Sequence, residues 1–183
     1  MSNRYSGAER EILRLIRAIL WLTAITLIPA LELRASIPWG IFKMDDQLSW
    51  PAVVFICLVV NIFLGWMVFW VMGPVFTFTR KWPWFDRVIW PLLERTRHRI
   101  HPYVEKYGEF GVAVFIGIPL PGSGVYTGAF GSYLLGLDKR KFAVANVIGV
   151  FIAAAAVTVI CLLILYGMVG KDSWMAKLFL KMR

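Results

Sequence analysis

The chain has 183 residues, of which 59% are hydrophobic and only 17% are charged, and its formal net charge is +9. A soluble domain of this length needs more polar surface, so the composition predicts a multi-pass protein of the cell membrane. The positive excess is typical of basic loops beside anionic lipid, which argues against nucleic acid as a partner. Cys57 and Cys161 are isolated in apolar runs, so neither a disulfide framework, a cysteine metal site nor a cofactor is expected.

The first apolar stretch, Ala18 to Leu31, is short for a membrane crossing. As a helix it spans about 21 Å, whereas the hydrocarbon core is roughly 30 Å thick. Two interpretations remain open. The stretch crosses fully if Arg14 and Arg17 reach back to the interface, or it is an arm that breaks near Pro29 and returns through ELRASIPWGIF.

The second apolar stretch carries no charge from Gln47 to Thr79 and predicts a full transmembrane helix. Trp50 and Trp70 suit its two interfaces. Asn61 lies near the middle of this helix. A hydrogen bond to another helix is the favoured role for this asparagine, ahead of a contact with substrate.

The segment from Arg80 to Gly108 combines basic residues, tryptophans and apolar residues spaced three and four apart. This pattern predicts an amphipathic helix that lies on the membrane surface. His98 and His101 are three residues apart within it, but no acidic or cysteine partner is near them in the sequence. A metal site is therefore not expected.

The third apolar stretch, Phe110 to Leu137, is uncharged but interrupted by prolines and glycines at residues 119–124. The helix before this break, up to Ile118, is about 13 Å long and reaches only half-way into a bilayer. A second arm from Val125 then makes a re-entrant hairpin, a helix pair that enters and leaves on the same side of the membrane. The alternative is close helix packing at Gly124 and Gly128, which fit G-x-x-x-G.

The order of elements repeats along the chain. The same order occurs around Pro29 and again around Pro119: an arm, a break, an arm, an aspartate, a polar turn and a full span. The second occurrence ends in the uncharged stretch Phe142–Gly170. One full span separates the two hairpins, so they should enter from opposite faces. The predicted fold is an all-α membrane protein with an inverted repeat and an amphipathic surface helix. The single domain comprises repeat 1 (about 12–79), a linker (80–108), repeat 2 (about 109–170) and a basic tail (171–183).

Irregular backbone at membrane depth is tolerated only where protein or a watery cavity surrounds it. The second break should leave backbone N–H groups and a helix N-terminus that attract anions. The sequence Gly122-Ser123-Gly124 is neither a phosphate-binding P-loop nor a dinucleotide fingerprint, because strand context and spacing are missing. Ser123 would be the nucleophile of a membrane enzyme, but no apolar span carries a base, so an enzyme is not expected.

Glu32 and Arg34 are ionisable residues within the first break. Such residues usually face a cavity or a partner and mark a functional site. If the break is extended, the two side chains share one side and can pair. Glu32 could then cycle a proton, and Arg34 could bind an anion such as phosphate. The alternative is that both residues are ordinary anchors at the interface.

At ELRASIPWGI and IPLPGSGVYTGA the chain resembles the small multidrug export protein family, a distant relative of the DedA superfamily of membrane proteins. The resemblance extends from the first apolar arm to the last span. It is carried by Glu32, Leu33, Arg34, Ile37, Pro38, Gly40 and by Ile118 through Gly124. The family name implies drug export. The DedA resemblance implies paired re-entrant hairpins and, for some members, proton-dependent movement of polyprenyl-phosphate lipids.

The sequence thus predicts a small transporter or flippase for an amphipathic or lipid-phosphate substrate, with proton coupling through the hairpin tips. The alternatives are a small-molecule exporter and an assembly factor without a transport cycle. The expected partners are membrane lipids and the substrate. Basic residues are nearly balanced between the two faces, which leaves orientation open and allows a homodimer. The candidate residues for binding or proton coupling are Glu32, Arg34, Pro38, Gly40, Pro119, Pro121, Gly122, Ser123, Gly124, Tyr126, Thr127 and Gly128.

Overall fold

A computed structural model describes residues 2–29, 31–44, 47–79, 81, 108–120 and 122–166, with side chains from Glu9 onward. Several sequence predictions fall outside these residues. They are the surface helix of the 80–108 linker with its two histidines, the basic tail 171–183, and Pro121 of the second break.

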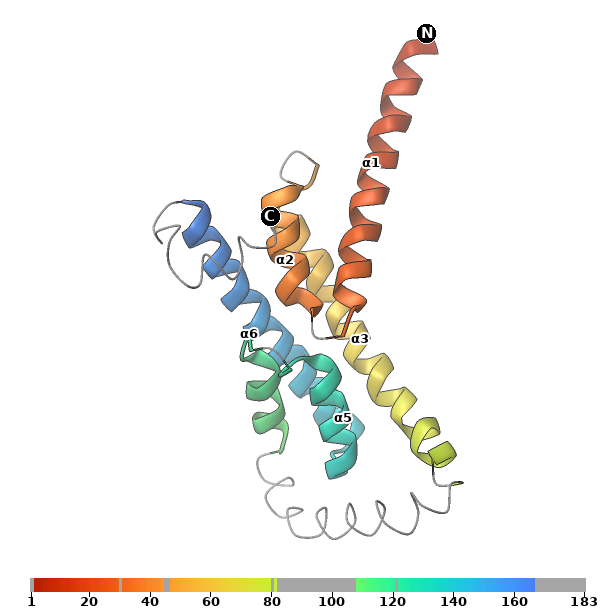
Figure 1. The fold of residues 1–183 in the computed structure, drawn as a ribbon, viewed down its shortest axis with the longest axis vertical. Coiled ribbons are helices and arrows are strands. Elements are labelled where there is room, and N and C mark those ends of the chain that lie inside the picture. Colours follow the sequence, from red (N-terminus) through yellow and green to blue (C-terminus); the bar gives the residue numbers. More distant parts are fainter. Residues whose placement is uncertain are drawn as a thin grey trace. The chain divides into compact units, whose positions relative to one another are not determined.

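The described residues are helical, and no strand occurs among them (Figure 1). The helices are α1 (Ser2–Leu27), α2 (Glu32–Lys43), α3 (Trp50–Thr79), α5 (Val125–Leu135) and α6 (Lys139–Leu165). A further apolar helix covers Gly108–Gly117. The predicted all-α class is therefore confirmed, and the sequence of helix, break, helix and long helix occurs twice along the chain.

Two of these helices, α3 and α6, are long and apolar enough to cross a membrane. α3 has 30 residues and α6 has 27, which correspond to roughly 45 Å and 40 Å of helix. Large apolar side chains such as Phe55, Phe63 and Trp70 are exposed along α3, as expected of a surface in contact with lipid. A long apolar helix is thus present at each of the two predicted spans, Gln47–Thr79 and Phe142–Gly170.

The chain divides into two compact units, which are described separately. The first unit comprises residues 1–61 and 153–183, and the second comprises 62–152. The long helices α3 and α6 therefore contribute one part to each unit.

In the first unit, α1 and α2 form a helical hairpin. The chain turns between Leu27 and Glu32, and α2 returns against α1 in the opposite direction (Figure 1). Two backbone N–H groups, those of Leu31 and Glu32, donate to the carbonyl of Ile28 at 3.1 and 3.2 Å and close the turn. The chain thus breaks near Pro29, and the re-entrant course of this hairpin stays a prediction.

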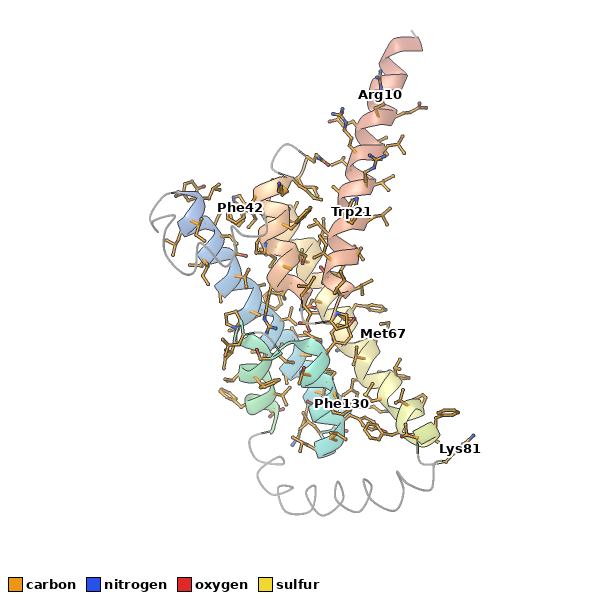
Figure 2. All side chains as sticks on the ribbon, in the orientation of Figure 1. Arg10, Trp21, Phe42, Met67, Lys81 and Phe130 are labelled. Atoms are coloured by element: carbon orange, nitrogen blue, oxygen red, sulfur yellow. The ribbon has the colours of Figure 1, made fainter. Side chains whose placement is uncertain are left out.

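α1 is longer than predicted, because it begins at Ser2 rather than within the apolar stretch. Its N-terminal part carries charged residues such as Arg10, which lies where α1 extends beyond α2 (Figure 2). The charged side chains of this part are exposed, from Glu9 to Arg17. Only the apolar second half of α1 packs against α2, and this half is the helical arm that the sequence predicted.

α2 also packs closely on α3 within the first unit, and Gly40 makes this approach possible. A Cβ placed on Gly40 would overlap the side chain of Val53 on α3 and would lie 3.0 Å from Leu22 Cδ2 on α1. Val53 and Leu22 are fully buried, so neither side chain has room to move away.

Replacing Gly40 with alanine is therefore expected to destabilise the protein by about 1–3 kcal/mol, the usual range for overpacking a tight contact. The measurement is the thermal unfolding temperature in detergent. Gly111→Ala is the matched control, because a Cβ there meets nothing within 4 Å. Equal unfolding temperatures for the two variants would contradict this account of the packing.

The second unit is held by glycine contacts and by a cluster of aromatic rings. A Cβ at Gly149 of α6 would lie 2.7 Å from the carbonyl oxygen of Ala113, and one at Gly128 of α5 would lie 2.6 Å from Ile116 Cγ1. Gly128 is thus a packing glycine, as the alternative interpretation of the G-x-x-x-G spacing proposed. The rings are Phe69, Phe76, Phe130, Tyr133 and Phe142, and Phe130 is visible on α5 in Figure 2.

Candidate functional site

The first candidate site lies at the start of α2. Glu32 is the first residue of this helix and is only 2% exposed. Its φ is +48°, in the left-handed region that residues other than glycine rarely adopt. Such a conformation is unfavourable by roughly 1–3 kcal/mol and persists where the surrounding structure imposes it, often at functional positions.

Arg34 is two residues further along the same helix and is partly buried. The carboxylate of Glu32 interacts electrostatically with its guanidinium group. The predicted extended backbone at Glu32–Arg34 is wrong, because both residues belong to the first turn of α2. On a regular helix, residues two apart point in different directions, and the left-handed backbone at Glu32 departs from that regular geometry.

A buried polar cluster continues from this position across the first unit. The hydroxyl of Ser36 donates to the carbonyl of Glu32 at 3.1 Å, and the hydroxyls of Thr26 and Ser36 are 2.8 Å apart. Thr26 also donates to the carbonyl of Leu22 at 2.8 Å, and both hydroxyls lie within hydrogen-bonding reach of the Cys57 thiol. Thr26, Ser36 and Cys57 are each 0% exposed, so α1, α2 and α3 meet at a polar junction next to Glu32.

Pro38 and Gly40, the other predicted site residues of α2, are buried in its later turns. Gly40 packs against Val53 and is placed for helix contact. Pro38 lies within the helix, where its ring removes one backbone donor.

The second candidate site is the break between Gly117 and Val125 in the second unit. Gly122 has φ +86°, which explains a glycine at this turn. Gly124 is the extended residue before α5, and its carbonyl accepts the first helical hydrogen bond, from Gly128 at 2.9 Å. The N-terminus of α5 therefore begins at the break, as predicted, and its helix dipole favours negative charge there.

The predicted residues of this break differ in exposure. Ser123 and Gly124 are buried, Tyr126 is partly buried, and Pro119 and Thr127 are exposed. Residues of the second break belong to the second unit, whereas Glu32 and Arg34 belong to the first. Each set is thus a candidate site within its own unit.

Comparison with known families identifies the chain. The family described as "Putative small multi-drug export protein" matches residues 32–156, about two thirds of the sequence. The chain belongs to this family. No curated protein and no solved structure matches it. The match begins at Glu32, the first residue of α2, and ends within α6, so it includes both motifs, ELRASIPWGI and IPLPGSGVYTGA. The predicted resemblance to this family is confirmed, whereas the relation to the DedA superfamily stays a prediction. The family and the apolar helices together indicate a membrane protein.

An asparagine that was not predicted from the sequence links α6 to α3 in the second unit. The side-chain Nδ2 of Asn146 donates to the carbonyl of Ile62 at 3.0 Å. A Cβ on Gly65 would overlap Asn146 Oδ1 and would lie 2.5 Å from Val125 Cγ1, at the first residue of α5. The interhelical hydrogen bond expected of Asn61 is therefore made by Asn146, another uncharged polar residue within a long apolar run.

The hydroxyl of Ser123 secures the second break. Its oxygen lies 2.7 Å from the carbonyl oxygen of Ile118 and 2.9 Å from that of Leu120, and these two acceptors share its single O–H proton. These carbonyls follow the helix Gly108–Gly117, and each also accepts a backbone N–H of the turn, from Leu120 at 2.8 Å and from Ser123 at 3.3 Å. Ser123 thus stabilises the turn through backbone acceptors.

Ser123→Ala is expected to destabilise the protein by about 1 kcal/mol, because the turn loses the hydrogen bond of the Ser123 hydroxyl while both carbonyls keep a backbone N–H donor. The thermal unfolding temperature measures this loss. Ser132→Ala is the control, since the buried Ser132 hydroxyl has no hydrogen-bond partner in the described part of the chain. Unfolding temperatures that fall equally in the two variants would contradict a specific role for Ser123.

Proposed function

We propose that this protein is a small exporter or flippase that moves an amphipathic, lipid-phosphate substrate across the cell membrane and is driven by protons. The observation that carries the proposal is the charge pair at the start of α2. Glu32 is 2% exposed, has a left-handed backbone, and interacts with Arg34 two residues away. A buried ionisable pair in a membrane protein is unfavourable to maintain and is typical of substrate or proton sites.

The two residues divide the chemistry between them. The planar guanidinium group of Arg34 can donate two parallel hydrogen bonds to a phosphate, which makes arginine well suited to a lipid-phosphate headgroup. The carboxylate of Glu32 competes for the same guanidinium group. Protonation of Glu32 would remove this competition, so proton uptake and phosphate binding would be linked at one position.

Helix lengths support re-entrant hairpins within this proposal. α2 has 12 residues and α5 has 11, about 18 Å and 17 Å of helix, which is short of the roughly 30 Å hydrocarbon core. Each is preceded by a break and followed by a long apolar helix. We infer an inverted repeat from this order, because paired broken helices are the arrangement of many transporters.

Export of a small molecule is the second candidate, and the family description favours it. A cationic drug would need the carboxylate of Glu32, rather than the guanidinium group of Arg34, as its binding group. The third candidate is an assembly factor, which should tolerate the loss of either charge as long as the protein folds.

The experiment is transbilayer movement of a fluorescent polyprenyl phosphate in proteoliposomes, with and without an imposed pH gradient. Movement that exceeds protein-free vesicles and responds to the gradient is the expected result. A cationic dye is tested in parallel. Movement of the dye alone would favour the small-molecule exporter, and movement of neither compound by folded protein would leave the assembly role.

A further inference from the structure

The contacts between α2 and α3 define an antiparallel register. Gly40 lies against Val53, and one turn earlier on α2 the Ser36 hydroxyl lies against the Cys57 thiol, one turn later on α3. Steps of four residues keep the same face of each helix in the interface. The next step places Glu32 at the level of Asn61, and both belong to the first unit.

Asn61 is an unusual residue at this position. It is only 1% exposed, and its side-chain Oδ1 accepts no hydrogen bond within the part of the chain that the structure describes. A buried amide oxygen without a donor is unfavourable by about 1–3 kcal/mol. The hydroxyls nearest along the interface, Thr26 and Ser36, already donate within their own cluster.

We propose that the side-chain oxygen of Asn61 is the acceptor for the proton that Glu32 carries. This inference rests on the proposed proton-driven function and names a second residue for it. In one state the ionised carboxylate of Glu32 interacts with Arg34. In the other state the carboxylate has taken a proton from the aqueous phase, and its O–H donates to Asn61 Oδ1. The guanidinium group of Arg34 then turns to the phosphate, and the proton returns to water when the carboxyl ionises again.

Few charged or titratable side chains lie around Glu32 in the part of the first unit that the structure describes. The charged group nearest to Glu32 on α2 is Arg34, and α3 contributes Cys57 as its titratable side chain next to Ser36. α1 has no charged residue between Ala18 and Leu27, and the described α6 residues of this unit include only Cys161 and Tyr166 as titratable groups. An asparagine suits the position because it accepts a hydrogen bond without adding a second negative charge, which would repel the ionised Glu32.

The test is infrared difference spectroscopy of the purified full chain during pH titration, and it needs no substrate. A carboxyl band that is absent from Glu32→Gln reports the protonated Glu32. In Asn61→Leu this band is expected at higher frequency, because the carboxyl has lost its acceptor.

Thr158→Val is the matched control, since it removes another buried polar oxygen of the first unit, a hydroxyl with no hydrogen-bond partner among the described residues. Its band should match the wild type. Asn61→Ser, a smaller polar replacement, gives a second variant if the leucine variant does not fold. An unchanged band in both Asn61 variants would overturn the proposal, as would a band that responds to sodium rather than to pH. A normal band with no lipid movement would instead contradict only the proposed function.

Discussion

Replacing Arg34 with glutamine is expected to reduce the movement of a lipid phosphate at least tenfold. Hydrogen bonds to charged groups are worth about 1.5–3 kcal/mol, and each 1.4 kcal/mol corresponds to a factor of ten in binding. Glutamine keeps a polar side chain but has neither the charge nor the planar fork. The measurement is the initial rate of headgroup movement in proteoliposomes that contain equal amounts of folded protein.

Two further variants make this result specific. Arg34→Lys keeps the charge without the fork and should retain part of the rate, because lysine binds phosphate only as a point charge. Arg140→Gln removes an exposed arginine from the first turn of α6 and should leave the rate unchanged. A wild-type rate in folded Arg34→Gln would contradict the role given to the guanidinium group. A loss as large in Arg140→Gln would point to net charge instead.

Glu32→Gln is expected to abolish the response of transport to a pH gradient. Glutamine has nearly the shape of a protonated glutamate but cannot release a proton, so substrate movement should continue downhill and ignore the gradient. The substitution also removes the competitor of Arg34 for phosphate. Headgroup binding should therefore become tighter and independent of pH, measured by titration of the detergent-solubilised protein with polyprenyl phosphate.

The control for Glu32 is Glu109, an exposed carboxylate in the helix Gly108–Gly117. Glu109→Gln should respond to a pH gradient as the wild type does. If transport by Glu32→Gln still responds to the pH gradient, another residue carries the coupling proton. The first unit then keeps only a substrate-binding role.

Long uncharged runs and helix breakers made much of the fold predictable. α3 and α6 followed directly from such runs, and prolines marked both breaks, because proline is poorly tolerated inside a helix. The start of α1 was missed because its first half is charged and exposed, so no apolar run reveals it. The surface helix of the linker stays a prediction, since it lies outside the described residues.

The site was predictable only in part. Glu32 and Arg34 stood out because charge is rare in an apolar context, but their backbone was expected to be extended and is helical. Pro29 favoured an extended chain after it, but the packing of α2 against α1 and α3 outweighed this local preference. Thr26, Ser36 and Asn146 were missed because their roles depend on which helices meet, and a sequence alone does not contain that information.

The most direct test of proton-driven lipid-phosphate movement is a recording of both species in the same proteoliposomes. A polyprenyl phosphate gradient is imposed at equal pH on both sides, and a trapped pH dye follows protons while a fluorescent headgroup follows the lipid. The account predicts that lipid movement drives a pH change in wild-type protein and none in Glu32→Gln. Lipid movement without any pH change in the wild type would contradict it.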